Sequence, residues 1–268
     1  VACFLLLGVA LIFVSEGAEA VDPVWSDDID SEENFVSISG DGNKIIAGGT
    51  SDSVYFYDYS SSTPSWNYDT DNNVLSVDLS NDGSKAIVAN NGGISYFDTS
   101  SSSPDWTSSD GGYPVSMNYT GNKMVTGDYT YLSSSEDYVD ELDGPNNVQN
   151  SVISSNGNYI VMAGGTCSGG SSYSTNVAFF DWGESDYEWR KTGYENIADI
   201  SGDGEKIVTA FQCGSSHAIR LFDSDGDQLW SSSPISQHAL SVKISEDGNY
   251  IVASFPSTGG SKVYVWET

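Results

Sequence analysis

The chain has 268 residues, enough for one large domain or two small ones. Acidic residues outnumber basic residues by 38 to 9, and the net charge of −29 argues against binding of the domain to nucleic acid or to an anionic membrane surface. Gly, Ser, Asp, Asn and Tyr are plentiful, and no stretch keeps a helical apolar period, so the composition favours an all-β chain. The carboxylates are spread along the whole sequence, which is typical of a solvated acidic surface, although a cation or a basic partner would suit the same charge.

Residues 1–20 differ from the rest of the chain. Residues 2–14 are an unbroken apolar run, short for a membrane span but right for the core of a signal peptide, and Ala18-Glu19-Ala20 offers the small residues that a signal peptidase reads. We therefore predict an exported protein, extracellular or at the cell surface, whose domain comprises residues 21–268. The alternative is that residues 1–20 are retained as an anchor or as a segment packed in a filament.

The pattern Pro23-Val24-Trp25 follows residues 1–20, and the sequence must show which strands it lies beside. The same Pro-x-Trp pattern returns at Pro64-Ser65-Trp66 and Pro104-Asp105-Trp106, each time after an apolar segment that ends in Asp. No such segment precedes Trp25.

A short polar residue followed by Gly recurs between apolar runs. The pairs are Asp41-Gly42, Asp82-Gly83, Thr120-Gly121, Asn156-Gly157, Asp203-Gly204 and Asp247-Gly248. Their spacing averages about 41 residues, and Asp-Gly and Asn-Gly suit the positive-φ positions of tight hairpin turns. Self-similarity at this period, with four strands per unit, predicts a six-bladed β-propeller.

One repeat shows the four predicted strands of a blade. Residues 74–80 form the inner strand, residues 85–90 the second and residues 94–98 the third, and the outer strand begins at Pro104. Proline is tolerated there because an outer strand is an edge, where a missing N–H breaks no ladder bond. Residues 129–145 belong to a degenerate unit without Trp.

The sixth unit ends with its third strand, residues 263–267, so its fourth strand is missing. We predict that every blade is a four-stranded antiparallel sheet. The N-terminal strand around Trp25 would then be the fourth strand of the last blade, and its pairing there would close the ring without a bare edge.

The repeats resemble two kinds of propeller. The segments "ISGDGEKIVTA" (residues 200–210), "ISEDGNYIVAS" (244–254) and "VYVWE" (263–267) look like WD40 repeats, and "LFDSDGDQLWSSS" (221–233) resembles the repeats of PQQ-like, quinoprotein-type propellers. This resemblance covers residues 21–268 and implies the architecture, whereas such folds host scaffolds, binders and enzymes alike. A Gly-His dipeptide paired with Trp-Asp, and the vicinal Cys pair of many quinoprotein dehydrogenases, are both missing from the sequence.

The sequence offers no catalytic constellation. Its two histidines, His217 and His238, lie in no recognisable catalytic motif. We therefore predict a non-catalytic binding or scaffold module, with two alternatives: a subunit of an extracellular filament or surface assembly held by residues 1–20, and a quinoprotein- or lactonase-like enzyme.

Propeller ligands usually bind at the mouth of the central channel. Alignment on the turns places at one inner-strand position Ser37, Asp78, Ser116, Val152, Asp199 and Lys243. Lys243 is the sole cation of this set and follows Asp199 in the next blade, so we expect an ion pair between blades. Asp78, Asp199 and Lys243, with Asn118 near the turn, are our candidates for binding a protein or small-molecule ligand; the alternative is that the pair only satisfies buried polar groups.

Two further groups of residues suggest a metal site and a disulfide. Asp223, Asp225 and Asp227 alternate like the start of a calcium loop, but Pro234 stands where the bidentate Glu is expected, so a plain turn fits the same residues. Cys167 and Cys213 end equivalent second strands, and for an exported chain we predict a disulfide between blades 4 and 5. Two free thiols are the alternative, because Cα atoms more than about 7 Å apart cannot be bridged.

Overall fold

Each polar-Gly pair of the sequence folds as the tight turn between two antiparallel strands. The computed structural model describes residues 22–29, 34–166, 174–193, 195–211, 218–257 and 260–268. The six turn glycines, residues 42, 83, 121, 157, 204 and 248, have φ between 67° and 80°. This left-handed backbone is strained for residues with a Cβ but not for glycine.

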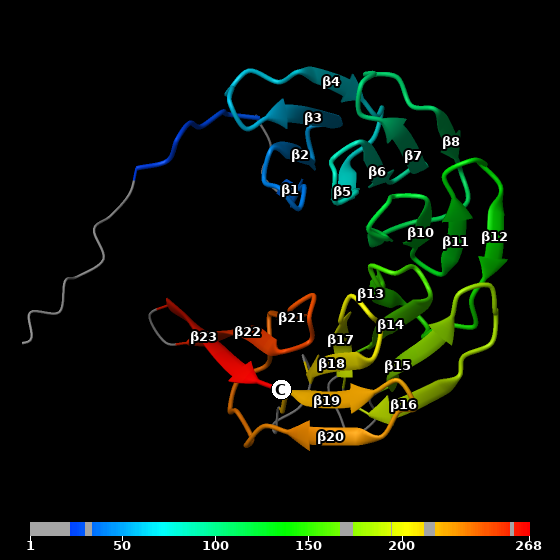
Figure 1. The fold of residues 1–268 in the computed structure, drawn as a ribbon, viewed down its shortest axis with the longest axis vertical. Helices are drawn as coiled ribbons and strands as arrows, with labels where there is room; N and C mark the ends of the chain where they lie inside the picture. Colours follow the sequence, from blue (N-terminus) through cyan, green and yellow to red (C-terminus); the bar gives the residue numbers. More distant parts are fainter. Residues whose placement is uncertain (1–21, 30–33, 167–173, 194, 212–217, 258–259) are drawn as a thin grey trace, which may run out of the picture.

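The strands form six antiparallel sheets placed around a ring, which we call blades 1 to 6 (Figure 1). Blade 1 contains β1 (Asn34–Ile38), β2 (Lys44–Gly49), β3 (Ser53–Asp58) and β4 (Trp66–Asp69). Blade 2 contains β5 (Val74–Leu79), β6 (Lys85–Asn90), β7 (Gly93–Asp98) and β8 (Trp106–Ser108). Blade 3 contains β9 (Val115–Met117), β10 (Lys123–Thr126), β11 (Tyr129–Leu132) and β12 (Tyr138–Glu141).

The second half of the chain repeats this arrangement. Blade 4 contains β13 (Val148–Ile153), β14 (Tyr159–Thr166), β15 (Ser174–Asp181) and β16 (Trp189–Gly193). Blade 5 contains β17 (Glu195–Ile200), β18 (Lys206–Phe211), β19 (Arg220–Asp223) and β20 (Gln228–Ser231). Blade 6 contains β21 (Ser241–Ile244), β22 (Tyr250–Ser257) and β23 (Gly260–Glu267). The predicted all-β fold with six blades is therefore confirmed.

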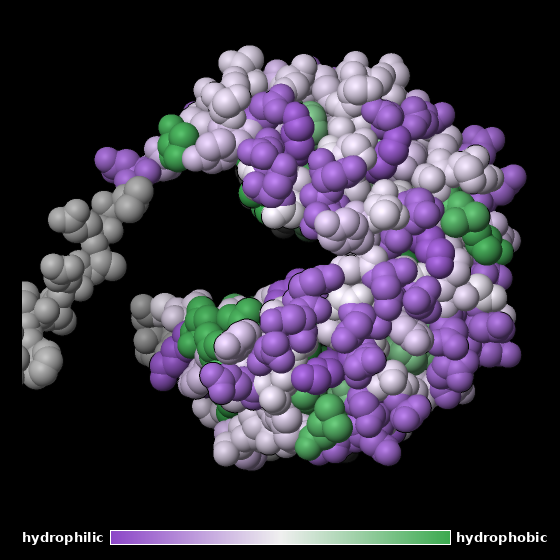
Figure 2. Space-filling view, viewed as in Figure 1, coloured by the Kyte–Doolittle hydropathy of each residue, from purple (hydrophilic) through white to green (hydrophobic). Residues whose placement is uncertain are grey.

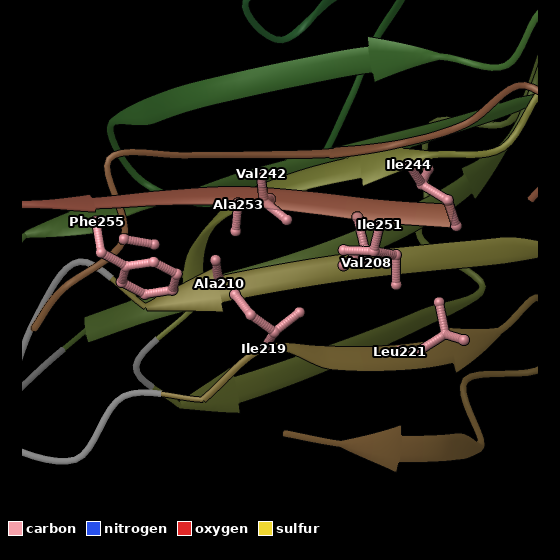
Figure 3. Close-up of a cluster of buried hydrophobic side chains, with 10 residues drawn as sticks. Val208, Ala210, Ile219, Leu221, Val242, Ile244, Ile251, Ala253 and Phe255 are labelled. Carbon is pink, nitrogen blue, oxygen red and sulfur yellow. The ribbon is translucent and has the colours of Figure 1, made fainter. Parts of the chain in front are cut away.

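The hydrophobic core is divided into layers between neighbouring blades. In the layer between blades 5 and 6, Val208 and Leu221 pack with Val242 and Ile251, and each of the four is at most 2% exposed (Figure 3). Alternate residues of each strand point to opposite faces of the sheet, so one blade contributes to two layers. Each interior blade is thus held by apolar contacts on both of its faces.

The expected pairing of the N-terminal segment with the last blade is not formed. β21, β22 and β23 make a three-stranded sheet, and the ring is open between blade 6 and blade 1 (Figure 1). Trp25 lies on blade 1 instead, where its ring stacks on that of Tyr57 at 5.5 Å between centroids and its Nε1 donates a hydrogen bond to the carbonyl oxygen of Tyr59 at 2.6 Å. These contacts hold the segment on blade 1, away from β23.

No helix among the described residues has the length and apolar character that a membrane crossing requires. The predicted leader, residues 1–20, lies outside the described residues, and its processing stays a prediction.

Candidate functional site

Polar side chains of the inner strands connect each blade to the next across the channel wall. Four side-chain oxygens at the aligned position accept a hydrogen bond from a backbone N–H of the next blade: Ser37 from Leu79 (3.2 Å), Asp78 from Met117 (2.9 Å), Ser116 from Ile153 (3.4 Å) and Asp199 from Ile244 (2.8 Å). The aligned position of the repeat is therefore a hydrogen-bonding position between blades. Val152 of blade 4 has no side-chain acceptor to offer.

Asp199 and Lys243 form the ion pair that the alignment indicates. The Nζ of Lys243 lies 2.9 Å from the Oδ1 of Asp199, whose side chain is 6% exposed, whereas the side chain of Lys243 is 61% exposed. Burial raises the pKa of Asp199 above its usual range, although Lys243 and the N–H of Ile244 lower it. The attraction of Asp199 in turn raises the pKa of Lys243.

Asp78 is a second carboxylate in the channel wall and is half-buried. Its Oδ1 accepts hydrogen bonds from the hydroxyl of Ser37 (3.0 Å) and the N–H of Leu79 (2.9 Å), while its Oδ2 accepts one from Met117. Burial raises the pKa of Asp78, and these hydrogen bonds oppose that effect. Both carboxylates thus already hold groups of the adjacent blade, which fits the structural role better than ligand binding.

The turns at one end of the ring are linked by backbone hydrogen bonds. Five backbone N–H groups each donate to a carbonyl oxygen in the turn of the next blade at 2.7–3.0 Å: Gly40 to Asn81, Asn81 to Tyr119, Tyr119 to Ser155, Asn156 to Gly202, and Gly202 to Glu246. Because the backbone holds these turns in register, their side chains are displayed from a rigid base.

A groove of about 560 Å³ runs over the turns of blades 3 to 6, and we call it the turn groove. It is lined by Asn118, Tyr119, Thr120, Asn122, Lys123, Ser155, Asn156, Gly202 and Glu246. Asn118 is the only one of the candidate binding residues that lies here; Asp78, Asp199 and Lys243 lie on the inner strands.

Glu246 spans three blades within the turn groove. Its Oε2 accepts a hydrogen bond from the hydroxyl of Ser155 at 2.8 Å, so that blade 6 contacts blade 4 over the turn of blade 5. A Cβ placed on Gly202 would lie 2.0 Å from the Oε1 of Glu246. The carboxylate can therefore cross blade 5 only because residue 202 has no side chain.

Lys123 enters the turn groove because its Nζ reaches toward the turn of the next blade, as that of Lys206 does toward Gly248. In blades 1 and 2 the first residue of the second strand pairs with the last residue of the third, as Lys44 with Asp58 and Lys85 with Asp98. In blade 3 the residue opposite Lys123 is Leu132, and the Nζ of Lys123 donates to the carbonyl oxygen of Gly157 at 2.7 Å. Burial lowers the pKa of Lys123.

The turn groove is the part of the site that sequence reasoning missed. The missing third-strand Asp in the repeat of residues 129–145 was only a weak signal for Lys123, because Lys206 has Asp223 opposite and still donates to the turn of the next blade. For Glu246 the signal was its charge: at this position, after Ser245, the other five repeats have the uncharged residues Gly, Asn, Tyr or Ser.

The predicted calcium residues form a closed turn. The Oδ1 of Asp223 accepts a hydrogen bond from the N–H of Asp227 at 2.8 Å, and the N–H of Asp223 donates to the carbonyl oxygen of Asp227 at 3.0 Å. Among the described residues, no group of three or more His, Cys, Asp or Glu side chains gathers in a metal-binding arrangement. The geometry favours the turn, and calcium stays a prediction for Asp223, Asp225 and Asp227.

The remaining candidates are placed only in part. Cys167, Cys213 and His217 lie outside the described residues, so the disulfide between blades 4 and 5 stays a prediction. His238 lies in the segment between β20 and β21, outside the turn groove.

Comparison with known proteins supports the same architecture. A family model described as outer membrane protein assembly factor BamB matches residues 18–232. Among solved structures, the β-propeller domain of Cps50 (Swd1) from Myceliophteria thermophila superimposes with a TM-score of 0.64 at 9% identity, over 85% of this chain and 81% of that chain. At this identity the likeness shows the fold alone. No curated protein matches the chain.

The resemblance to WD40-like and PQQ-like propellers is thus confirmed by a family match over most of the sequence and by a shared fold. The chain belongs to the PQQ-like β-propeller family described as outer membrane protein assembly factor BamB.

Proposed function

We propose that the chain is an exported, non-catalytic binding or scaffold module that holds a polar ligand or a protein segment in the turn groove. The observation that carries this proposal is the convergence of side chains from blades 3, 4 and 6 on one hollow, with Glu246 fixed across Gly202. Positions fixed by backbone hydrogen bonds between turns favour recognition, because little conformational entropy is lost when a ligand binds.

The chemistry of the turn groove suits a ligand that both donates and accepts hydrogen bonds. Asn122, Asn156 and Ser155 provide amide and hydroxyl groups, and Lys123 and Glu246 add one charge of each sign. The ring of Tyr119 is 54% exposed and offers an apolar face at the edge of the groove. A peptide or a sugar presents this combination of groups, whereas an apolar ligand does not.

The non-catalytic part of the proposal follows from the groove's residues. None of its lining residues is a His or Cys, and Lys123 and Glu246 are held by Gly157 and Ser155 rather than by a nucleophile that they could activate. The family's name, that of an outer membrane assembly factor, favours a setting in the cell envelope and agrees with the predicted leader.

Binding to an arrayed panel of peptides and glycans, followed by calorimetry with the best hit, tests the proposal. Tyr119→Ala and Glu246→Gln are each expected to weaken that binding at least tenfold. Tyr59→Ala is the control, because Tyr59 is similarly exposed (48%) but lies on blade 1. A panel without hits, or a hit that both groove variants bind as well as the wild type does, would contradict the proposal. An absorbance spectrum and metal analysis that revealed a bound redox cofactor would contradict its non-catalytic part.

A further inference from the structure

The second strand begins with a lysine in four of the six blades, and in blades 1 and 2 its ammonium group is bound within the same blade. In blade 2 the Nζ of Lys85 lies 2.7 Å from the Oδ2 of Asp98, the last residue of the third strand. In blade 1 Lys44 pairs with Asp58 in the same way, and its Nζ also lies over the ring of Phe56, 5.9 Å from the centroid. The repeat therefore holds an ammonium group here with a carboxylate and an aromatic ring.

Blade 4 keeps the carboxylate and the ring but not the lysine. Tyr159 stands at the lysine position, opposite Asp181, and Phe179 stands at the position of Phe56, two residues before the end of the third strand. The ring of Phe179 stacks on those of Tyr159 and Trp189, at 5.4 Å between centroids in both cases. Asp181 is thus left without the ammonium partner that the repeat provides in blades 1 and 2.

A pocket of about 300 Å³ lies at this place between blades 4 and 5, and we call it the acidic pocket. It is lined by the three rings just described and by three carboxylates: Asp181, Glu188 and Asp225. Asp225 belongs to blade 5, and its neighbour Ser224 is held there by a hydrogen bond from the Nε1 of Trp189 to its carbonyl oxygen at 2.9 Å. Two blades thus place carboxylates around one hollow beside aromatic rings.

The carboxylates of the acidic pocket are not neutralised by the part of the chain that the structure describes. Within that part, no lysine or arginine lines the pocket, and none forms an ion pair with Asp181, Glu188 or Asp225. Lys191 lies over the ring of Trp189, with its Nζ 5.6 Å from the centroid, but it does not line the pocket. The acidic pocket therefore favours a ligand that brings a positive charge.

An organic cation suits the acidic pocket better than a metal ion does. No three carboxylates among the described residues gather in a metal-binding arrangement, so Asp181, Glu188 and Asp225 surround the hollow rather than converge on one point. Aromatic faces attract an ammonium group through the quadrupole of the ring, and they also pack against the methylene groups that carry it. The pocket has room for the end of a lysine side chain or of a diamine.

We propose that the acidic pocket binds the alkylammonium group of a ligand, either a lysine side chain of a partner protein or a small diamine or polyamine. The ligand supplies to Asp181 the ammonium group that Lys44 and Lys85 supply within their own blades, and its methylene groups lie against Tyr159. This site goes beyond the proposed function, because it shares no lining residue with the turn groove.

The charge of the whole molecule assists such a ligand without selecting it. The net charge of −29 attracts cations of every kind, and the face of the ring in Figure 2 is mostly hydrophilic. Selection comes from the acidic pocket, where carboxylates lie beside aromatic rings. Binding should therefore weaken as salt screens the charges, and it should require the ammonium group itself.

The test is an NMR titration of the nitrogen-15-labelled full chain, in which the indole N–H signal of Trp189 reports on the acidic pocket. The probes are N-acetyl-lysine methylamide, cadaverine, and N-acetyl-lysine methylamide acetylated at Nε. EDTA in the buffer keeps calcium away from Asp225. We expect saturable shifts with the charged probes and none with the neutral one, which keeps the shape of lysine but lacks its charge.

The two charged probes distinguish the sources of the alkylammonium group. Binding of the lysine probe alone identifies a protein partner, and binding of cadaverine alone identifies a small amine; either result, or binding of both, supports the proposal. Absence of a saturable shift with both charged probes, or equal binding of the acetylated probe, would overturn it.

Tyr159→Lys tests whether the pocket is the place of the missing lysine. The introduced ammonium group is expected to pair with Asp181, as in blades 1 and 2, and to weaken binding of the charged probes roughly tenfold. Tyr250→Lys is the matched control, because it makes the same change of charge at the equivalent position of blade 6. Unchanged binding by Tyr159→Lys, or an equal loss in both variants, would overturn the proposal.

A second pair of variants separates the pocket from the acidic surface in general. Glu188→Gln is expected to weaken binding about threefold, whereas Asp105→Asn, at the equivalent position of blade 2, should leave it unchanged. Equal effects of the two would show attraction to the overall charge only and would overturn the proposal. Tyr119→Ala should leave the shifts unchanged, so failure at the acidic pocket and failure at the turn groove are distinguishable.

Discussion

Lys243 and Asp199 occupy the same position of successive repeats, and their Nζ and Oδ1 atoms lie 2.9 Å apart. The exposures of the two side chains are unequal, 61% for Lys243 and 6% for Asp199. The lysine can therefore be hydrated on its own, whereas the aspartate depends on the lysine for compensation of its charge.

Lys243→Met is expected to lower the free energy of unfolding by ~1–3 kcal/mol at pH 7, because it leaves a buried carboxylate unpaired; the exposure of the lysine keeps this below the value for a fully buried pair. Burial raises the pKa of Asp199, so acidification protonates it and removes the need for a cation. The loss should thus be smaller at pH 5 than at pH 7 in urea unfolding. Lys262→Met, on exposed β23, controls for the change in net charge, and an equal loss at both pH values would contradict the account.

The turn aspartates give the fold a dependence on pH of the opposite sign. Hydrogen bonds from the N–H of Ser84 and the hydroxyl of Ser80 lower the pKa of Asp82. A lowered pKa contributes stability that is present above the unfolded value, near 4, and is lost as the pH falls through the folded value. Asn156 makes the same two contacts without a charge, through Ser154 and Asn158.

Asp82→Asn should therefore keep the turn and lose only the charge-dependent part of its stability. The difference in the free energy of unfolding between wild type and Asp82→Asn is expected to be largest above about pH 4 and to shrink as the pH falls through the lowered pKa of Asp82. Chemical unfolding across this range measures it. Asp82→Ala, which removes the acceptor itself, should be less stable than Asp82→Asn at every pH.

Two outer-strand tryptophans allow the contribution of an indole hydrogen bond to the free energy of unfolding to be measured apart from that of ring stacking. The Nε1 of Trp106 donates to the carbonyl oxygen of Ser133 at 3.0 Å, whereas the buried Nε1 of Trp230 has no hydrogen-bond partner among the described residues. Trp106→Phe should destabilise the protein by ~0.5–1.5 kcal/mol more than Trp230→Phe does. Thermal unfolding of the two variants measures this difference. Equal losses of stability in the two variants would show that the hydrogen bond of Trp106 contributes nothing beyond ring packing.

Gly202→Ala is predicted to move the carboxylate of Glu246 for a steric reason. The added methyl group would meet the tip of the exposed Glu246 side chain, which can rotate away, so we expect loss of the hydrogen bond to Ser155 at a cost of no more than about 1 kcal/mol in the free energy of unfolding. Gly112→Ala is the matched control, since a Cβ at Gly112 meets nothing within 4 Å. A loss well above about 1 kcal/mol in chemical unfolding would show that Glu246 cannot move aside.

The blades could be predicted from sequence because each depends on local signals. Asp82-Gly83 fixes a turn by its backbone preference, and the alternation around residues 74–79 fixes the faces of β5, so neither needs information from distant residues. The ion pair between Asp199 and Lys243 could also be predicted from the sequence, because equivalent positions of successive repeats become neighbours in space.

The position of Trp25 and the turn groove could not be predicted in the same way. Trp25 has the local pattern of an outer strand, and its placement depends on which neighbour is available, a competition that no local pattern encodes. Glu246 becomes a groove residue because Gly202 of the neighbouring blade leaves room for it, and Lys123 because it reaches Gly157 in the turn of the next blade. Both roles therefore depend on neighbouring blades rather than on the local sequence.

The opening in the ring affects how the molecule unfolds. Among the described residues, blades 1 and 6 each contact one neighbouring blade and the others contact two, so this part of the chain is a linear array of units with nearest-neighbour coupling. Such an array frays from its ends, and amide exchange should be fastest in β1 and β23 and slowest in blades 3 and 4. Local opening would then begin at the terminal blades, below the free energy of global unfolding.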